Sequence, residues 1–193
     1  MKKNVLFIHG AGDGAYEADK KLATSLQHSL GSEYDVHCPA MPDEGNAPYE
    51  QAKRQIEKEL GRLPEPVILV AHSVGASTVM KWLSEEGEKP IAGIFLMATP
   101  YWGGNGWRYD GYQELELPKG FAARLPKGAP LFLYHSRDDD VVPFAHLALY
   151  AEQLPQATVR EFDGRGHQFN NDVSEVAADI RSLEDLHQFG LWS

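Results

Sequence analysis

Residues that could perform nucleophilic acyl transfer stand at the ends of apolar runs in this chain. Ser73 and His167 each follow a short apolar run closely, and so do three consecutive aspartates at 138–140. A serine hydroxyl becomes a strong nucleophile when a histidine takes its proton, and a carboxylate holds that histidine in the correct tautomer. The three residue types therefore predict a Ser-Asp-His arrangement.

The local sequence around Ser73 is typical of a nucleophile elbow. An apolar run at Val67–Ala71 passes through Ser73 into a helical pattern without a spacer. The elbow is a sharp strand-to-helix turn, so the residues two before and two after the serine must be small. Ala71 and Gly75 meet that need, although the first of these positions is usually Gly. An ordinary helix N-cap serine is the alternative interpretation.

The intermediate of acyl transfer needs N–H donors that stabilise its oxyanion. The amide of Val74, directly after the serine, is one candidate donor. The glycine-rich segment His9–Gly14 follows the first apolar run, and Ala11 or its neighbour Gly12 is the second candidate. A glycine-rich turn without a catalytic donor is the alternative.

The elements that must position these residues alternate between strands and helices. A parallel sheet with helices on both faces follows, a three-layer α/β/α fold in which functional groups collect at the carboxyl ends of the strands. The expected strands are Val5–Ile8, Tyr34–His37, a run from Val67, Ile91–Ala98, Leu131–His135 and Thr158–Phe162. The expected helices are Lys20–Leu30, Tyr49–Leu60, a helix from the elbow to about Gly87, Pro143–Leu154 and Val173–Leu186.

Size and composition bound the function further. The 193 residues predict one domain, 1–193, and the net charge of −10 argues against nucleic acid and anionic membranes as partners. The single Cys38 excludes an internal disulfide. The apolar run after Met1 stops at His9, too early for a signal peptide, and no run is long enough to span a membrane. We therefore expect a cytoplasmic protein, and its oligomeric state is open.

Four motifs together resemble the α/β-hydrolase superfamily. They are His9-Gly10-x-Gly12, Ala71-x-Ser73-x-Gly75, Asp139-x-x-x-Pro143 and Gly166-His167. The short chain is most similar to the small serine hydrolases that include retinoblastoma-binding protein nine. This resemblance implies a minimal fold of six parallel strands in the order 2-1-3-4-5-6, with a triad of Ser73, Asp139 and His167. The sequence departs from that group in the third consecutive aspartate and in an aromatic insert after Ala98.

Two details stay open at this point. The family pattern places the acid four residues before Pro143, at Asp139, but a slip of one residue in the turn would exchange it with Asp138. The insert at about 101–120 leaves the carboxyl end of a strand and is rich in aromatic residues. We expect it to form a partial cap in which Trp102 and Trp107 bind substrate, with packing into the core or against a partner as the alternative.

We weigh three functions on these grounds. The first is a cofactor-free and metal-free serine hydrolase that cleaves a small ester in preference to an amide. The second is a protein-interaction module with a vestigial hydrolase site, although such a site would be expected to lose at least one triad member. The third is a metal-dependent hydrolase, but its candidate ligands lack a metal-binding spacing. Those candidates are His135, Asp138, His146 and His167.

Overall fold

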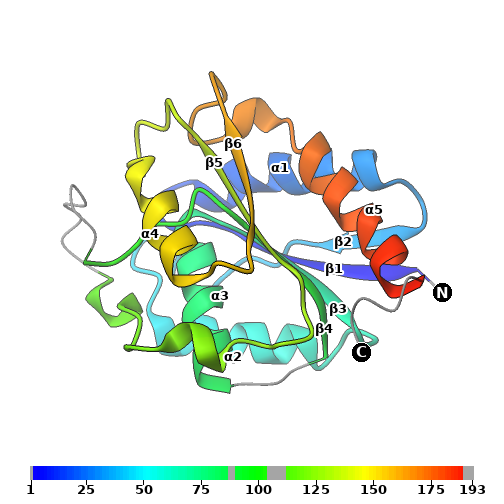
Figure 1. The fold of residues 1–193 in the computed structure, drawn as a ribbon, viewed down its shortest axis with the longest axis horizontal. Coiled ribbons are helices and arrows are strands. Elements are labelled where there is room, and N and C mark those ends of the chain that lie inside the picture. Colours follow the sequence, from blue (N-terminus) through cyan, green and yellow to red (C-terminus); the bar gives the residue numbers. More distant parts are fainter. Residues whose placement is uncertain (1, 87–89, 104–111, 189–193) are drawn as a thin grey trace.

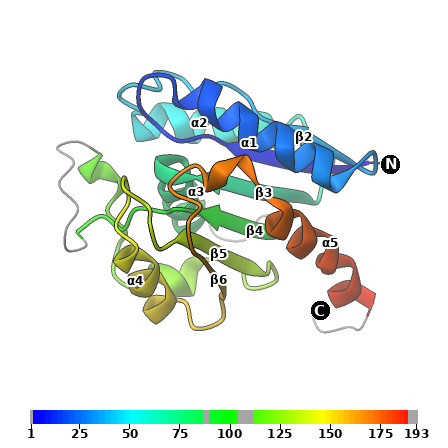
Figure 2. The same ribbon diagram turned by 90° about the horizontal axis from the view of Figure 1, so that it is seen from above.

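Six parallel strands form one sheet in the order β2-β1-β3-β4-β5-β6 (Figure 2). The structure is a computed structural model that describes residues 2–86, 90–103 and 112–188. The strands are β1 (Lys3–Ile8), β2 (Tyr34–His37), β3 (Val67–His72), β4 (Ile91–Met97), β5 (Leu131–Ser136) and β6 (Thr158–Phe162). This arrangement confirms the predicted fold class and strand order.

Helices cover both faces of the sheet. Figure 1 shows α1 and α5 on one side of the sheet and α2, α3 and α4 on the other. The helices are α1 (Ala15–Leu30), α2 (Tyr49–Leu60), α3 (Ser73–Glu86), α4 (Ala145–Gln153) and α5 (Ser174–Gln188), with short 3₁₀ turns at Gln113–Leu115, Phe121–Arg124 and Phe169–Asn171. Within the described ranges, no helix combines the length and apolar character needed to cross a membrane.

Strand β3 lies at the centre of the sheet and contributes to both apolar layers. All six of its residues are buried. Successive side chains of a strand point to opposite faces, so Leu69 packs among the α2–α3–α4 layer and Val70 among the α1–α5 layer. A strand buried on both faces needs the unbroken apolar run that the sequence shows. The central position of β3 places the residue that follows it at the middle of the carboxyl edge.

The first helix begins earlier than the predicted Lys20. Helix α1 starts at Ala15 because Glu44, from the loop after β2, satisfies amides at its N-terminus. The Glu44 carboxylate accepts hydrogen bonds from the N–H groups of Gly14 (3.3 Å) and Tyr16 (2.8 Å). A carboxylate is favoured at this end of a helix. The other predicted bounds agree closely with the structure, and the assignment of 1–193 to one domain stays a prediction.

Gly75 lets helix α3 approach strand β1 closely. A Cβ atom at this position would lie 2.2 Å from the carbonyl oxygen of His9 and 2.8 Å from that of Ile8. We therefore expect Gly75→Ala to lower the free energy of unfolding by about 1–3 kcal/mol, because the backbone must shift to admit the methyl group. Urea unfolding followed by circular dichroism measures this loss.

Gly128→Ala is the matched control for this prediction. A Cβ atom at Gly128 would meet no other atom within 4 Å. Its free energy of unfolding should therefore stay within about 0.5 kcal/mol of the wild-type value. Equal unfolding midpoints for Gly75→Ala and the wild type would show that helix and strand do not approach as closely as described.

Candidate active site

Ser73 is the first residue of α3 and follows β3 without a connecting loop. Its φ angle is 53°, in the left-handed region that side-chain-bearing residues seldom adopt. Such strain persists only where the surroundings impose it, and here the buried strand and the close approach at Gly75 do so. The predicted elbow geometry is present, and it turns the serine hydroxyl out at the carboxyl edge of the sheet.

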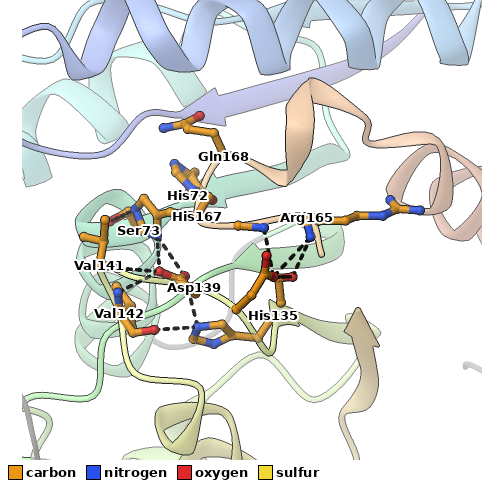
Figure 3. Close-up of polar contacts among 12 residues, drawn as sticks. His72, Ser73, His135, Asp139, Val141, Val142, Arg165, His167 and Gln168 are labelled. Atoms are coloured by element: carbon orange, nitrogen blue, oxygen red, sulfur yellow. Dashed lines mark hydrogen bonds and ion pairs between the residues drawn. The ribbon is translucent and has the colours of Figure 1, made fainter. Parts of the chain in front are cut away.

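His167 lies between Ser73 and Asp139 (Figure 3). Its Nε2 atom is 3.1 Å from the Ser73 hydroxyl oxygen. Its Nδ1 atom is 2.8 Å from Asp139 Oδ2 and 3.0 Å from Oδ1. An ionised carboxylate only accepts hydrogen bonds, so Nδ1 carries the proton and Nε2 faces the serine as an acceptor. This is the tautomer that a general base requires.

Asp139 is held by donors on two sides. Its side chain is fully buried, and Oδ1 accepts the N–H groups of Val141 (2.9 Å) and Val142 (2.8 Å). On the other oxygen, His135 Nε2 lies 3.2 Å away. Burial favours the neutral acid, but hydrogen bonds from His135, His167 and the Val142 amide outweigh it and hold the pKa of Asp139 well below its usual range. The carboxylate therefore stays ionised beside His167.

The neighbouring aspartates have different surroundings. Asp138 Oδ1 accepts the Ser136 hydroxyl (2.5 Å) and the N–H groups of Arg165 (3.1 Å) and Gly166 (3.0 Å). It therefore fastens the loop that carries His167 and does not contact that histidine itself. Asp140 is exposed, and within the described residues its side chain makes no hydrogen bond or ion pair. Of the three aspartates, the structure brings Asp139 to the imidazole.

Arg165 fixes the same loop through its side chain. Its guanidinium makes a two-point contact with Glu175 on α5, at 2.8 Å and 2.6 Å. The guanidinium also lies over the Phe162 ring, 4.4 Å from the ring centroid. A bidentate pair restricts both position and orientation. The loop between β6 and α5 is therefore anchored just before His167, by Asp138 and by Glu175.

Burial disfavours a charge on His167. Burial of the ring lowers its pKa, the hydrogen bond with Asp139 raises it, and the nearby His72 lowers it again, with a net decrease below the usual histidine value. The imidazole is therefore neutral near neutral pH, the state in which it can accept the serine proton.

The sequence matches the family model described as serine hydrolase over residues 23–174. This chain belongs to the serine hydrolase family. The match covers most of the chain and confirms the resemblance seen in its motifs. No match to a curated protein was found.

Solved structures similar to this serine hydrolase family member share its fold. SOBER1 of Arabidopsis thaliana has 15% identity and a TM-score of 0.69, covering 95% of this chain and 99% of that chain. The ydeN gene product of B. subtilis has 19% identity and a TM-score of 0.66, covering 95% and 100%. An esterase domain from Rhodothermus marinus has 14% identity and a TM-score of 0.68, covering 94% and 87%. At these identities the similarity shows the fold alone.

The glycine-rich loop after β1 lies directly beside Ser73 in this family member. A Cβ atom at Gly10 would be 3.2 Å from Ser73 Cβ. Of the two predicted donors in this loop, the Gly12 N–H already binds the Glu44 carbonyl at 2.8 Å. Ala11 is partly exposed, and the described part of the chain offers its N–H no acceptor. Of the two predicted donors in this loop, Ala11 therefore keeps its N–H available, and its role with Val74 as an oxyanion donor stays a prediction.

His9 stabilises this loop. Its ring is buried, and Nε2 accepts the N–H of Met41 at 2.8 Å. The other ring nitrogen, Nδ1, must then carry the proton, and it donates to the Gly10 carbonyl at 2.6 Å. The loop is thus tied to the segment after β2, which the sequence pattern did not predict.

The aromatic insert is described in part. Trp102 is 7% exposed and packs in the apolar layer on the α3 face, with its ring 5.7 Å from that of Tyr112. The Tyr112 hydroxyl donates to the carbonyl of Gly45 at 3.1 Å. Trp107 lies outside the described residues. The partial cap and the substrate contacts of both tryptophans stay predictions.

Asp19 is a site residue that sequence reasoning missed. It lies on α1, fully buried, with its carboxylate 2.9 Å from Nδ1 of His72. The sequence did contain an indication that Asp19 is buried. Asp19 precedes Leu22 by three residues, so it lies on the same apolar face of the helix as the buried leucines. An acid on the buried face of a helix indicates a buried partner.

The candidate metal ligands have other contacts. His135 and His167 both contact Asp139, and Nδ1 of His146 accepts the N–H of Tyr101 at 2.8 Å. Within the described ranges, the His, Cys, Asp and Glu side chains form no group of three or more arranged to hold a metal ion.

Proposed function

We propose that this member of the serine hydrolase family hydrolyses a small carboxylic ester, with Ser73 as nucleophile, His167 as general base and acid, and Asp139 as the triad acid. The observation that carries the proposal is the 3.1 Å contact between His167 Nε2 and the Ser73 hydroxyl. The other ring nitrogen of His167, Nδ1, is held by the ionised, buried carboxylate of Asp139. A base with this tautomer can accept the serine proton as the oxygen attacks.

The first half of the proposed reaction forms an acyl-enzyme. Ser73 Oγ attacks the ester carbonyl carbon while its proton passes to His167 Nε2. The carbonyl oxygen becomes an oxyanion, which the N–H groups of Ala11 and Val74 stabilise. The imidazolium of His167 then gives its proton to the departing alcohol oxygen as the carbon–oxygen bond breaks. Asp139 stabilises the imidazolium between these two steps.

The second half returns the enzyme to its starting state. A water molecule gives a proton to His167 Nε2 and attacks the acyl carbon. The same oxyanion donors act again, and the proton passes back to Ser73 Oγ as the carboxylic acid leaves. An ester is favoured over an amide because an alcohol leaves a tetrahedral intermediate more readily than an amine. The esterase domain among the similar structures supports this choice at the level of the fold.

A fluorophosphonate probe tests the proposed activity directly. Such a probe forms a stable bond only with an activated serine, so wild-type protein should be labelled and the label should map to Ser73 by mass spectrometry. Ser73→Ala should stay unlabelled, as should heat-denatured wild type. Unlabelled wild type beside a known serine hydrolase that labels in the same tube would refute the proposal.

A further inference from the structure

A second histidine–carboxylate pair lies next to the candidate triad, and the proposed reaction does not use it. His72 is the residue before Ser73, and its ring is 1% exposed, as is the side chain of Asp19. His72 Nδ1 lies 2.9 Å from Asp19 Oδ2, and Nε2 lies 2.9 Å from the carbonyl oxygen of His167. Figure 3 shows His72 on the side of His167 that faces away from Asp139.

The contacts of His72 determine its protonation. A carbonyl oxygen can only accept a hydrogen bond, so Nε2 must carry a proton toward His167. Nδ1 faces a carboxylate, and both oxygens of that carboxylate already accept other N–H donors. A ring whose two nitrogens both face acceptors is an imidazolium. In agreement, burial lowers the pKa of His72, but the charge and hydrogen bond of Asp19, with the His167 carbonyl and Asp139, together outweigh burial and raise that pKa. The pKa of Asp19 itself is lowered to about 2.

Asp19 connects helix α1 to the loops around the site. Its Oδ2 accepts the N–H of Gly10 at 2.7 Å, in the loop that carries the candidate oxyanion donor. Its Oδ1 accepts Nε2 of Gln168 at 3.1 Å, directly after His167. Through His72 the same carboxylate reaches the main chain of His167 itself. One buried charge therefore joins the oxyanion loop, the elbow and the histidine loop.

We propose that Asp19 and His72 form a buried ion pair that positions His167 against Ser73 and keeps a cation beside the base. Both are positioning residues, because neither contacts the reacting atoms. This inference rests on the proposed hydrolase activity for its catalytic consequence. The ion pair itself is a property of the folded protein, so it can be tested with or without that activity.

The cation has a predictable effect on the base. The ring centroids of His72 and His167 are 4.7 Å apart, and the positive charge disfavours protonation of His167. Asp139 and the more distant Asp19 act in the opposite direction, and His72 acts more strongly on His167 than Asp19 does. Burial, with a smaller contribution from Asp19, raises the pKa of Cys38 to about 12, so this thiol stays neutral. The Asp19–His72 pair therefore lowers the pKa of His167, so that His167 stays deprotonated at lower pH than it would without the pair.

Nitrogen-15 NMR of the histidine rings tests the ion pair in the wild-type protein. The His72 signal, assigned by its loss in His72→Gln, should show two protonated ring nitrogens across the acidic and neutral range. Because its pKa is raised, this charge should be lost only as the pH rises above the usual histidine value. A neutral His72 ring at neutral pH would overturn the proposal, whether or not the protein hydrolyses esters.

Asp19→Asn tests the effect on the base. Asn keeps the shape of Asp19, but His72 loses its counter-ion and becomes neutral in its buried position. The pKa of His167, followed by NMR, should rise by roughly half a unit to one unit, and the acid limb of kcat/KM should move to higher pH by the same amount. A role in packing alone would lower kcat at every pH without moving this limb.

Asp35→Asn is the matched control. It removes an aspartate that lies 3.8 Å from a histidine, His37, but both side chains are partly exposed on β2 and neither is buried. The pKa of His167 should not change in this variant. An unchanged His167 pKa in Asp19→Asn would overturn the proposed effect on the base. If ester hydrolysis is absent, the NMR titrations still decide the inference, and if Asp19→Asn does not fold, the wild-type spectrum decides it.

Discussion

Ser73→Ala should remove esterase activity on short aryl esters and leave the fold intact. Loss of a triad nucleophile typically lowers kcat by about 10⁴-fold or more, because the reaction loses the covalent step. The stability cost should be small. Among the residues that the structure describes, the hydroxyl makes one hydrogen bond, to His167, and such a bond contributes about 0.5–1.5 kcal/mol. Initial rates with p-nitrophenyl acetate and urea unfolding measure the two effects separately.

Ser84→Ala controls for a general effect on helix α3. Ser84 lies on the same helix, is buried to the same degree as core residues, and its hydroxyl donates to the carbonyl of Lys81 at 2.7 Å. Ser84 is far along the helix from the carboxyl edge of the sheet. The esterase rate of Ser84→Ala should therefore stay near the wild-type value. Activity of Ser73→Ala within tenfold of the wild type would refute the nucleophile assignment.

The sheet was predictable because its physical requirements are local. A central parallel strand must be apolar on both faces, and Val67–Ala71 satisfies this without reference to the rest of the chain. The elbow was predictable for a similar reason, since small residues two before and two after Ser73 are a steric need of the turn itself. The order of the strands followed from the resemblance of the motifs, not from periodicity.

The supporting residues of the site were harder to predict, because their partners are distant in sequence. Asp138 holds the amides of Arg165 and Gly166, and nothing near Asp138 in the chain indicates that role. From the sequence alone Asp138 is an alternative triad acid, since the spacing of a turn is ambiguous by one residue. His72 stands directly before Ser73, but its partner Asp19 is 53 positions away. A side-chain pair of this kind becomes visible only when the topology brings the two elements together.

Asp139→Asn should reduce kcat by about 10⁴-fold, because Asn holds His167 in the wrong tautomer. The amides of Val141 and Val142 both donate to Oδ1, so the oxygen of Asn must stay on that side. Its NH₂ group then points at Nδ1 of His167, which must give up its proton to accept. The remaining ring proton moves to Nε2, and the histidine can no longer accept the proton of Ser73.

The same substitution at the two neighbouring aspartates should have mild effects. In Asp138→Asn, one oxygen can still accept Ser136, Arg165 and Gly166, because all three donors meet Oδ1. In Asp138→Ala those contacts are lost, and a looser His167 loop should lower kcat by between about tenfold and a hundredfold. Asp140→Asn, at an exposed position, serves as the control for charge removal. Steady-state kcat is compared among the four variants. A large loss of kcat in Asp138→Asn, with kcat of Asp139→Asn near the wild-type value, would move the triad acid by one residue.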